Sequence, residues 1–423
     1  MASSDVRAHE IEPTTLASTE FRAVMAVTLV IMFGFGLIVP TLPLFAKRFG
    51  VGEAGIGLVL TVFAATRLAA DFFAGSLIDR FGERAMVAAG AVIVGISSVG
   101  AGAAPNFPAL VILRGAGGIG SAFFLGGLTA HIIGTVTAEE RGRAMSVFQA
   151  TIGIGLLLGP LAGGLLAAAA GLRAPLFLYG AICIVAAPVV VRVMSSAHVP
   201  ASALTDAPVL DDPVPAPAAP AWERLKPLFG DSAYRAALIG SAAGFYVSGG
   251  IQTLIPGFWE DVLHRSTGSV GLPFTVLALT SLAVVWHAGS LSDRRGRKFA
   301  LVPALAATGI FAALMGSVTS ALALLVFIAL LGVASGYARP GPTSIVADVA
   351  SPEQRAVAVA GYRTAADVGA LVGPIVVGVV AQYLGYGPAF IAVGSLALVA
   401  AVVTLLARET APRRTHARQP AGA

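Results

Sequence analysis

Two arginine–aspartate pairs are the residues whose types and spacing could do chemistry. Arg67 with Asp71, and Arg363 with Asp367, each interrupt a long apolar run. Residues four apart share one face of a helix, so each arginine can reach its aspartate. A carboxyl group in an apolar setting beside an arginine can take up and release a proton. We predict Asp367, near the middle of its run, as the first candidate proton carrier and Asp71 as the second. Two static ion pairs are the alternative.

The composition is that of a membrane protein. Of the 423 residues, 57% are hydrophobic and 12% are charged, and the mean hydropathy is +0.86. Soluble proteins carry about 25% charged residues, so a water-covered globular protein is excluded. The net charge of +5 lies in loops and does not indicate a nucleic acid partner. Cys183 is the only cysteine, which excludes an intrachain disulfide, and the polar first 20 residues do not form a signal peptide.

Twelve apolar runs are long enough to cross a bilayer. They span residues 21–46, 54–78, 84–104, 107–134, 143–170, 173–194, 233–260, 267–291, 299–319, 321–346, 356–384 and 386–407. We therefore predict an all-α polytopic membrane protein with twelve transmembrane helices in two pseudo-symmetric six-helix bundles, 21–194 and 233–407. The proline-rich stretch 195–232 is expected to be a flexible linker, and 1–20 and 408–423 are expected to be tails.

The basic residues predict the orientation, because Lys and Arg are enriched in cytoplasmic loops. Loops on one side hold Lys47, Arg48, Arg173 and Arg265. The opposite side holds many more: Arg80, Arg84, Arg141, Arg143, Arg224, Lys226, Arg294, Arg295, Arg297, Lys298 and Arg355. The linker and both termini are therefore predicted to be cytoplasmic.

A short charged turn occurs twice, at 75–84 and 289–298, and its aspartates are 293 − 79 = 214 residues apart. Gly159-Pro160 recurs as Gly373-Pro374 at the same offset. Parallel halves of six helices suit a transporter whose halves rock around a central site. Charges at helix ends can hold one conformation closed. The candidate gate residues are Gly75, Asp79, Arg80, Gly82, Arg84, Gly289, Asp293, Arg294, Gly296 and Arg297.

Both turns resemble the signature between helices 2 and 3, and 8 and 9, of the major facilitator superfamily. Residues 153–164 resemble the antiporter motif of its drug/proton antiporters, carried here by Gly155, Gly159, Pro160, Gly163 and Gly164. Residues 34–43 are similar to the first helix of the twelve-helix branch. The resemblance implies that Arg114, in the fourth run, takes part in proton coupling. It also implies that the pairs of runs 2 and 11 meet as a cytoplasmic gate closed by the turn residues.

The predicted function is secondary-active export of a small amphipathic compound in exchange for protons. The protein would be a multi-pass monomer of the inner (cytoplasmic) membrane without a cofactor or metal. Candidate substrate contacts are Gln149, Tyr246, Gln252, Tyr337 and Arg339. An uptake carrier for a small nutrient on the same fold is the first alternative. A polytopic membrane enzyme is the remote one, since we find no metal-ligand spacing, nucleophile elbow or nucleotide-binding loop.

Overall fold

The computed structural model describes residues 16, 18–137, 140–194, 221–351 and 353–410. Twelve helical spans in it are long and apolar enough to cross a membrane, which confirms the predicted fold class. The first half contains six spans, the first of which is α1 continued by α2. Its helices are α1 (Thr19–Ile38), α2 (Thr41–Lys47), α3 (Glu53–Phe81), α4 (Glu83–Gly102), α5 (Phe107–Thr135), α6 (Arg141–Ala170) and α7 (Ala174–Val193).

The second half repeats this arrangement with short helical extensions. Its elements are α9 (Ala221–Leu225), η1 (Lys226–Gly230), α10 (Ser232–Gly257), η2 (Phe258–Val262), η3 (Thr267–Ser269), α11 (Gly271–Arg295), α12 (Arg297–Leu314), η4 (Met315–Ser317), α13 (Ala321–Ala338), α14 (Pro340–Val349), α15 (Arg355–Leu384) and α16 (Tyr386–Leu406). One span breaks between α1 and α2 at Pro40, and another between α13 and α14 at Pro340. Proline lacks the N–H that a continuous helix needs.

Glycine allows the two halves to touch backbone to backbone. A Cβ on Gly57 of α3 would lie 2.3 Å from the Pro374 carbonyl of α15, and one on Gly378 would lie 2.5 Å from the Glu53 carbonyl. Likewise, a Cβ on Gly271 of α11 would lie 2.0 Å from the Pro160 carbonyl of α6. Small residues permit such dry contacts between membrane helices. The halves are therefore joined through α3 with α15 and α6 with α11.

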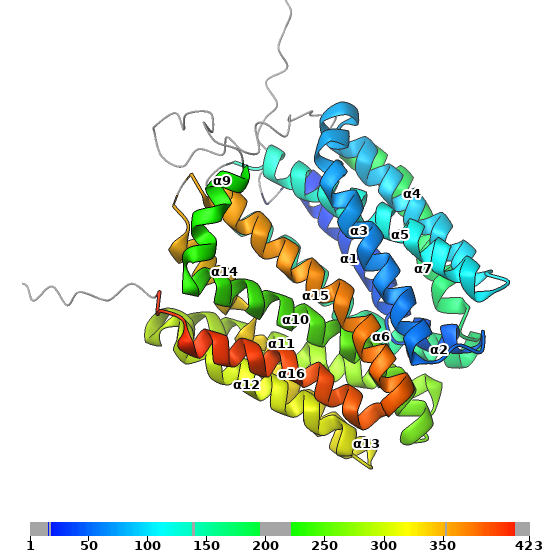
Figure 1. Cartoon of the computed structure of the whole chain (residues 1–423). Helices are drawn as coiled ribbons and strands as arrows, with labels where there is room; N and C mark the ends of the chain where they lie inside the picture. Colours follow the sequence, from blue (N-terminus) through cyan, green and yellow to red (C-terminus); the bar gives the residue numbers. More distant parts are fainter. Residues whose placement is uncertain (1–15, 17, 138–139, 195–220, 352, 411–423) are drawn as a thin grey trace, which may run out of the picture.

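These contacts lie toward one end of the molecule. We call the end with the two charged turns the turn end, and the end with the loops around Arg48 and Arg265 the far end. The halves meet near the far end and diverge toward the turn end (Figure 1). At the turn end, a Cβ on Gly75 or Gly289 would meet nothing within 4 Å.

Part of the stretch expected to be a flexible linker is helical. Residues 221–230 form α9 and η1, since the Leu228 side chain is buried against the second half and the Arg224 guanidinium donates to the Glu353 carbonyl at 3.4 Å. Residues 195–220 of the expected linker, and most of both expected tails, lie outside the described residues. Just after η1, hydrogen bonds from Arg408 lower the pKa of the Asp231 carboxyl group.

A substitution in α6 tests the close packing of the first half. A Cβ on Gly163 would lie 2.1 Å from the Leu37 carbonyl of α1, whereas a Cβ on Gly153 of the same helix has open space. We expect Gly163→Leu to lower the free energy of unfolding by about 1–3 kcal/mol through overpacking. Thermal unfolding in detergent measures this. Gly153→Leu is the matched control, and equal melting temperatures of the two variants would contradict the packing.

Candidate functional site

Arg67 joins the two halves where they begin to part. Its Nη2 lies 3.3 Å from Oδ1 of Asp367 on α15, and its Nε lies 3.8 Å from Oδ2 of Asp71, one turn along α3. Thr61, nearer the far end, donates to the Leu371 carbonyl at 2.9 Å. Arg67 and Asp367 therefore form the ion pair at the turn-end limit of the α3–α15 contact. The structure brings the predicted residues of these two helices together.

The second arginine–aspartate pair completes a cluster of four charges. Arg363 interacts electrostatically with both Asp71 and Asp367. Asp367 is the less accessible acid, with its side chain 21% exposed against 40% for Asp71. Two arginines and two carboxylates sum to zero, so protonation of either acid leaves one uncompensated positive charge. An uncompensated charge in an apolar environment is costly, and the cluster can therefore couple protonation to how the halves meet.

Arg114 of α5 is buried among aromatic rings of the first half. Its guanidinium carbon lies 4.5 Å from the centroid of the Phe63 ring, and its side chain is 3% exposed. The Phe35 ring lies 6.0 Å from Phe63 and 6.1 Å from Tyr179. Cation–π attraction offsets part of the cost of removing the guanidinium from water. Within the described residues, Nε of Arg114 has no hydrogen-bond partner.

A hydrogen bond links the surroundings of the two arginines. The hydroxyl of Thr66, next to Arg67 on α3, donates to the carbonyl of Gly115, next to Arg114 on α5, at 2.7 Å. The two helices are close here because Gly118 has no side chain, and its Cβ would lie 2.3 Å from the Phe63 carbonyl. A displacement of α3 is therefore felt at Arg114.

The antiporter-like motif of α6 lies at two close helix contacts. Gly159 approaches Gly36 of α1 so closely that an added Cβ would lie 2.5 Å from its Cα. A Cβ on Gly164 would lie 3.0 Å from the Gly268 carbonyl in the other half. The motif thus supplies a smooth helix surface at the junction of the halves.

Sequence analysis missed an ionic network at the far end. Lys47 pairs with Glu53 at 3.0 Å and with Asp261 of the other half. The Tyr386 hydroxyl lies 2.7 Å from Glu53 Oε1 and 2.9 Å from Asp261 Oδ2. The far-end network, defined by these four residues, fastens the halves together. The repeat offset could have found its central pair, because 261 − 47 = 214.

At the turn end, the second charged turn binds within its own half. Arg297 pairs with Asp293 and, through Nε at 2.9 Å, with Asp348 of α14. Gly82 and Gly296 adopt φ values of 81° and 110°, which favour glycine and make both short turns possible. Arg80 lies with its guanidinium carbon 5.3 Å from the Phe81 ring centroid.

The five candidate substrate contacts have separate surroundings. Gln149 and Arg339 are exposed, whereas Tyr246 is 6% exposed. Gln252 donates to the Ser248 hydroxyl at 3.4 Å in its own helix. Tyr337 hydrogen bonds to His287 of α11 and lines a groove beside α12. The recorded hydrogen bonds of the described residues do not join these five into one cluster.

The sequence matches the Major Facilitator Superfamily over residues 24–286 and 237–423. The chain belongs to the major facilitator superfamily. It is similar to Multidrug resistance protein 2 of Bacillus subtilis (strain 168), with 33% identity over 169 residues, 40% of this chain and 42% of the relative. It is 28% identical to the quinolone resistance protein NorA of Staphylococcus aureus (strain MRSA252) over 37% of this chain and 40% of NorA. These alignments span about two fifths of the relatives' length.

Solved structures of this superfamily share the fold. A bacterial homolog of the human lysosomal transporter Spinster, crystallised in an inward-facing, unoccupied conformation, superposes with a TM-score of 0.76. That alignment covers 92% of this chain and 96% of the other at 15% identity. The human organic anion transporter MFSD10 gives a TM-score of 0.63 at 18% identity, over 92% of this chain and all of the other. At these identities the likeness concerns the fold alone.

The far-end network generates a conformational prediction. We expect Lys47→Gln to shift the equilibrium toward opening of the far end by about 1 kcal/mol, roughly fivefold in population, because two carboxylates lose their shared cation. Spin labels on cysteines at Arg48 and Arg265, in a background with Cys183 replaced by serine, report the distance between the halves. Lys47→Arg keeps the charge and serves as the control. An unchanged distance distribution in Lys47→Gln would show that the network does not hold this end closed.

Proposed function

We propose that the protein is a secondary-active exporter that exchanges protons for small amphipathic compounds by alternating access. The observation that carries this is the ion pair between Arg67 and Asp367, which joins the halves at the limit of their contact at 3.3 Å. A group that can change charge at this position connects proton binding to the rocking of the halves. The partial similarity to drug-resistance proteins supports the class of cargo.

The turn end is the cytoplasmic end in this proposal, because most loop Lys and Arg residues lie there. The conformation is then open to the cytoplasm and closed at the far end by the network around Lys47. The protein resides in the inner membrane as a monomer with both termini in the cytoplasm, and the proton is its coupling ion.

In the proposed cycle, ionised Asp367 attracts Arg67 in the conformation described here. A proton that arrives from the far side neutralises one acid of the cluster and weakens the attraction between α3 and α15. Release of that proton to the turn side restores the pair. Asp71, 3.8 Å from Arg67, is the second acid that can take the proton. Arg114, held next to α3 through Thr66 and Gly115, senses the same movement.

Export rather than uptake is supported by the α6 motif and by the names of the relatives. Gly159 of the motif packs on Gly36 of α1, while Gly164 faces Gly268 across the halves. A nutrient carrier on the same fold would give a growth defect on one substrate when the gene is removed.

Accumulation assays test the proposed direction and cargo. Cells that lack the protein are expected to accumulate more of at least one amphipathic compound from a panel that includes a fluoroquinolone and a lipophilic cation. A protonophore should remove the difference between the strains, because it collapses the proton gradient. Lower accumulation without the protein would instead establish an importer.

Substitution of the proton carrier tests the coupling. We expect Asp367→Asn to lose transport driven by an imposed pH gradient in proteoliposomes, because an amide does not exchange a proton in this range. Glu353→Gln, at an exposed position at the turn end, removes one carboxylate outside the cluster and is the matched control. A fully active Asp367→Asn protein would exclude Asp367 as the carrier and direct the same test to Asp71.

A further inference from the structure

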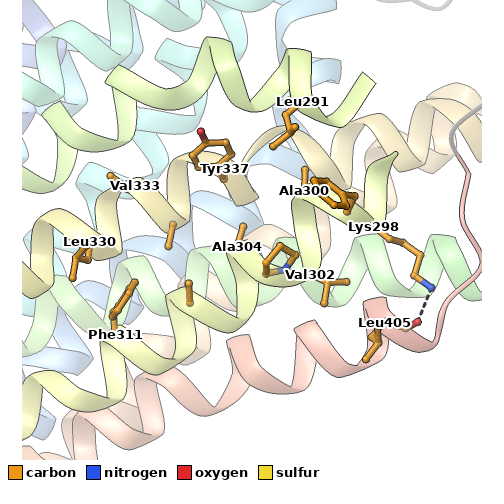
Figure 2. A pocket seen from close by; sticks show the side chains of 14 residues that line it. Leu291, Lys298, Ala300, Val302, Ala304, Phe311, Leu330, Val333, Tyr337 and Leu405 are labelled. Carbon is orange, nitrogen blue, oxygen red and sulfur yellow. Dashed lines mark hydrogen bonds between the residues drawn. The ribbon is translucent and has the colours of Figure 1, made fainter. Parts of the chain in front are cut away.

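An apolar groove lies on the flank of the second half. It has a volume of about 760 Å³ and is formed mainly by α12 and α13. Pro303, Phe311, Leu330, Val333 and Tyr337 are among the side chains that line it (Figure 2). These two helices pack against others of the second half and lie on the side away from the first half (Figure 1). The groove therefore belongs to the outer surface that faces the bilayer and is separate from the junction of the halves.

The repeat explains why the groove exists only in this half of the doubled design. In the first half, Gly90 of α4 and Gly120 of α5 let these helices touch, and a Cβ on Gly90 would lie 2.5 Å from the Phe124 nitrogen. At the 214-residue offset their counterparts are Ala304 and Ala334. Both alanines line the groove. Their methyl groups hold α12 and α13 apart at the points where the glycines allow contact.

The groove has a basic end. Lys298 lines it at the start of α12, and its ammonium group donates to the Leu405 and Ala407 carbonyls at 2.6 and 2.7 Å (Figure 2). An ammonium group has three donors, so one remains for a ligand. The Arg295 guanidinium carbon lies 5.3 Å from the ring centroid of Phe299, which also lines the groove. A cationic mouth and an apolar body complement the charged head and apolar tail of an anionic lipid.

The acids near the mouth already have partners. The Glu409 carboxylate accepts hydrogen bonds from the backbone N–H groups of Arg297 and Lys298 at 3.0 and 3.1 Å. Asp293 pairs with Arg297. These contacts reduce the repulsion that the carboxylates would exert on a phosphate.

We propose that the groove binds one acyl chain of an anionic glycerophospholipid, whose phosphate is held at the mouth by Lys298 and Arg295. A groove of this volume lies within the range of about 300–1,000 Å³ that is typical of ligand sites. Basic side chains near a membrane surface favour anionic headgroups. The site is independent of the transport proposal, because it lies outside the junction of the halves.

Native mass spectrometry of the purified full chain tests this site. Phosphatidylglycerol and phosphatidylcholine with identical acyl chains are added in equal amounts, and the lipids retained by the protein are counted. We expect the unaltered chain to retain one phosphatidylglycerol with a preference of about fivefold over phosphatidylcholine. Lys298→Gln should lose this preference, and Lys298→Arg should keep it.

A second pair of variants tests the apolar body of the groove. Val333→Phe fills the groove and should lower retention of both lipids about tenfold, whereas Val326→Phe makes the same exchange at an exposed position of α13 outside it. Equal retention of the two lipids by the unaltered chain would overturn the proposal without any variant. Equal retention by Val333→Phe and Val326→Phe would also overturn it. A dimer that only Val333→Phe abolishes would assign the groove to a second copy of the chain.

Discussion

The close approach of α3 to α15 is the constraint on which the rest of the structure depends. Gly57 and Gly378 remove side-chain volume at this contact, so backbone meets backbone between the halves. The distance from Arg67 to Asp367 follows from that approach, because each side chain extends from one of the two helices. A wider crossing would leave charges of both halves without partners in an apolar environment, which is costly.

Charge neutralisation then distinguishes the two ends of the molecule. At the far end, Lys47 is shared between acids of both halves, which fastens them together. At the turn end, Arg297 is shared between two acids of its own half, Asp293 and Asp348, and does not join the halves. The same kind of interaction therefore closes one end and leaves the other free to separate. Such rearrangements of ion pairs are compatible with the rocking of two rigid bundles.

The two halves have diverged within their common design. Arg297 occupies the position that corresponds to Glu83, since 297 − 83 = 214, and Glu83 is buried in the first half. Ala304 replaces the equivalent of Gly90, and a groove opens beside it. Duplication preserved the number and order of helices, while single residues altered the charges and the packing of each half.

The sequence by itself determined the twelve spans, the doubling at 214 residues, and the spacing that puts Arg67 and Asp71 on one helix face. Hydropathy and helical periodicity are local properties, so they can be read without a structure. Only the tertiary structure decided that Arg67 lies closer to Asp367 than to Asp71, and that Lys47 meets Asp261. It also placed Tyr337 in the flank groove. These relationships depend on how helices far apart in the chain pack, and on which end of the molecule is closed.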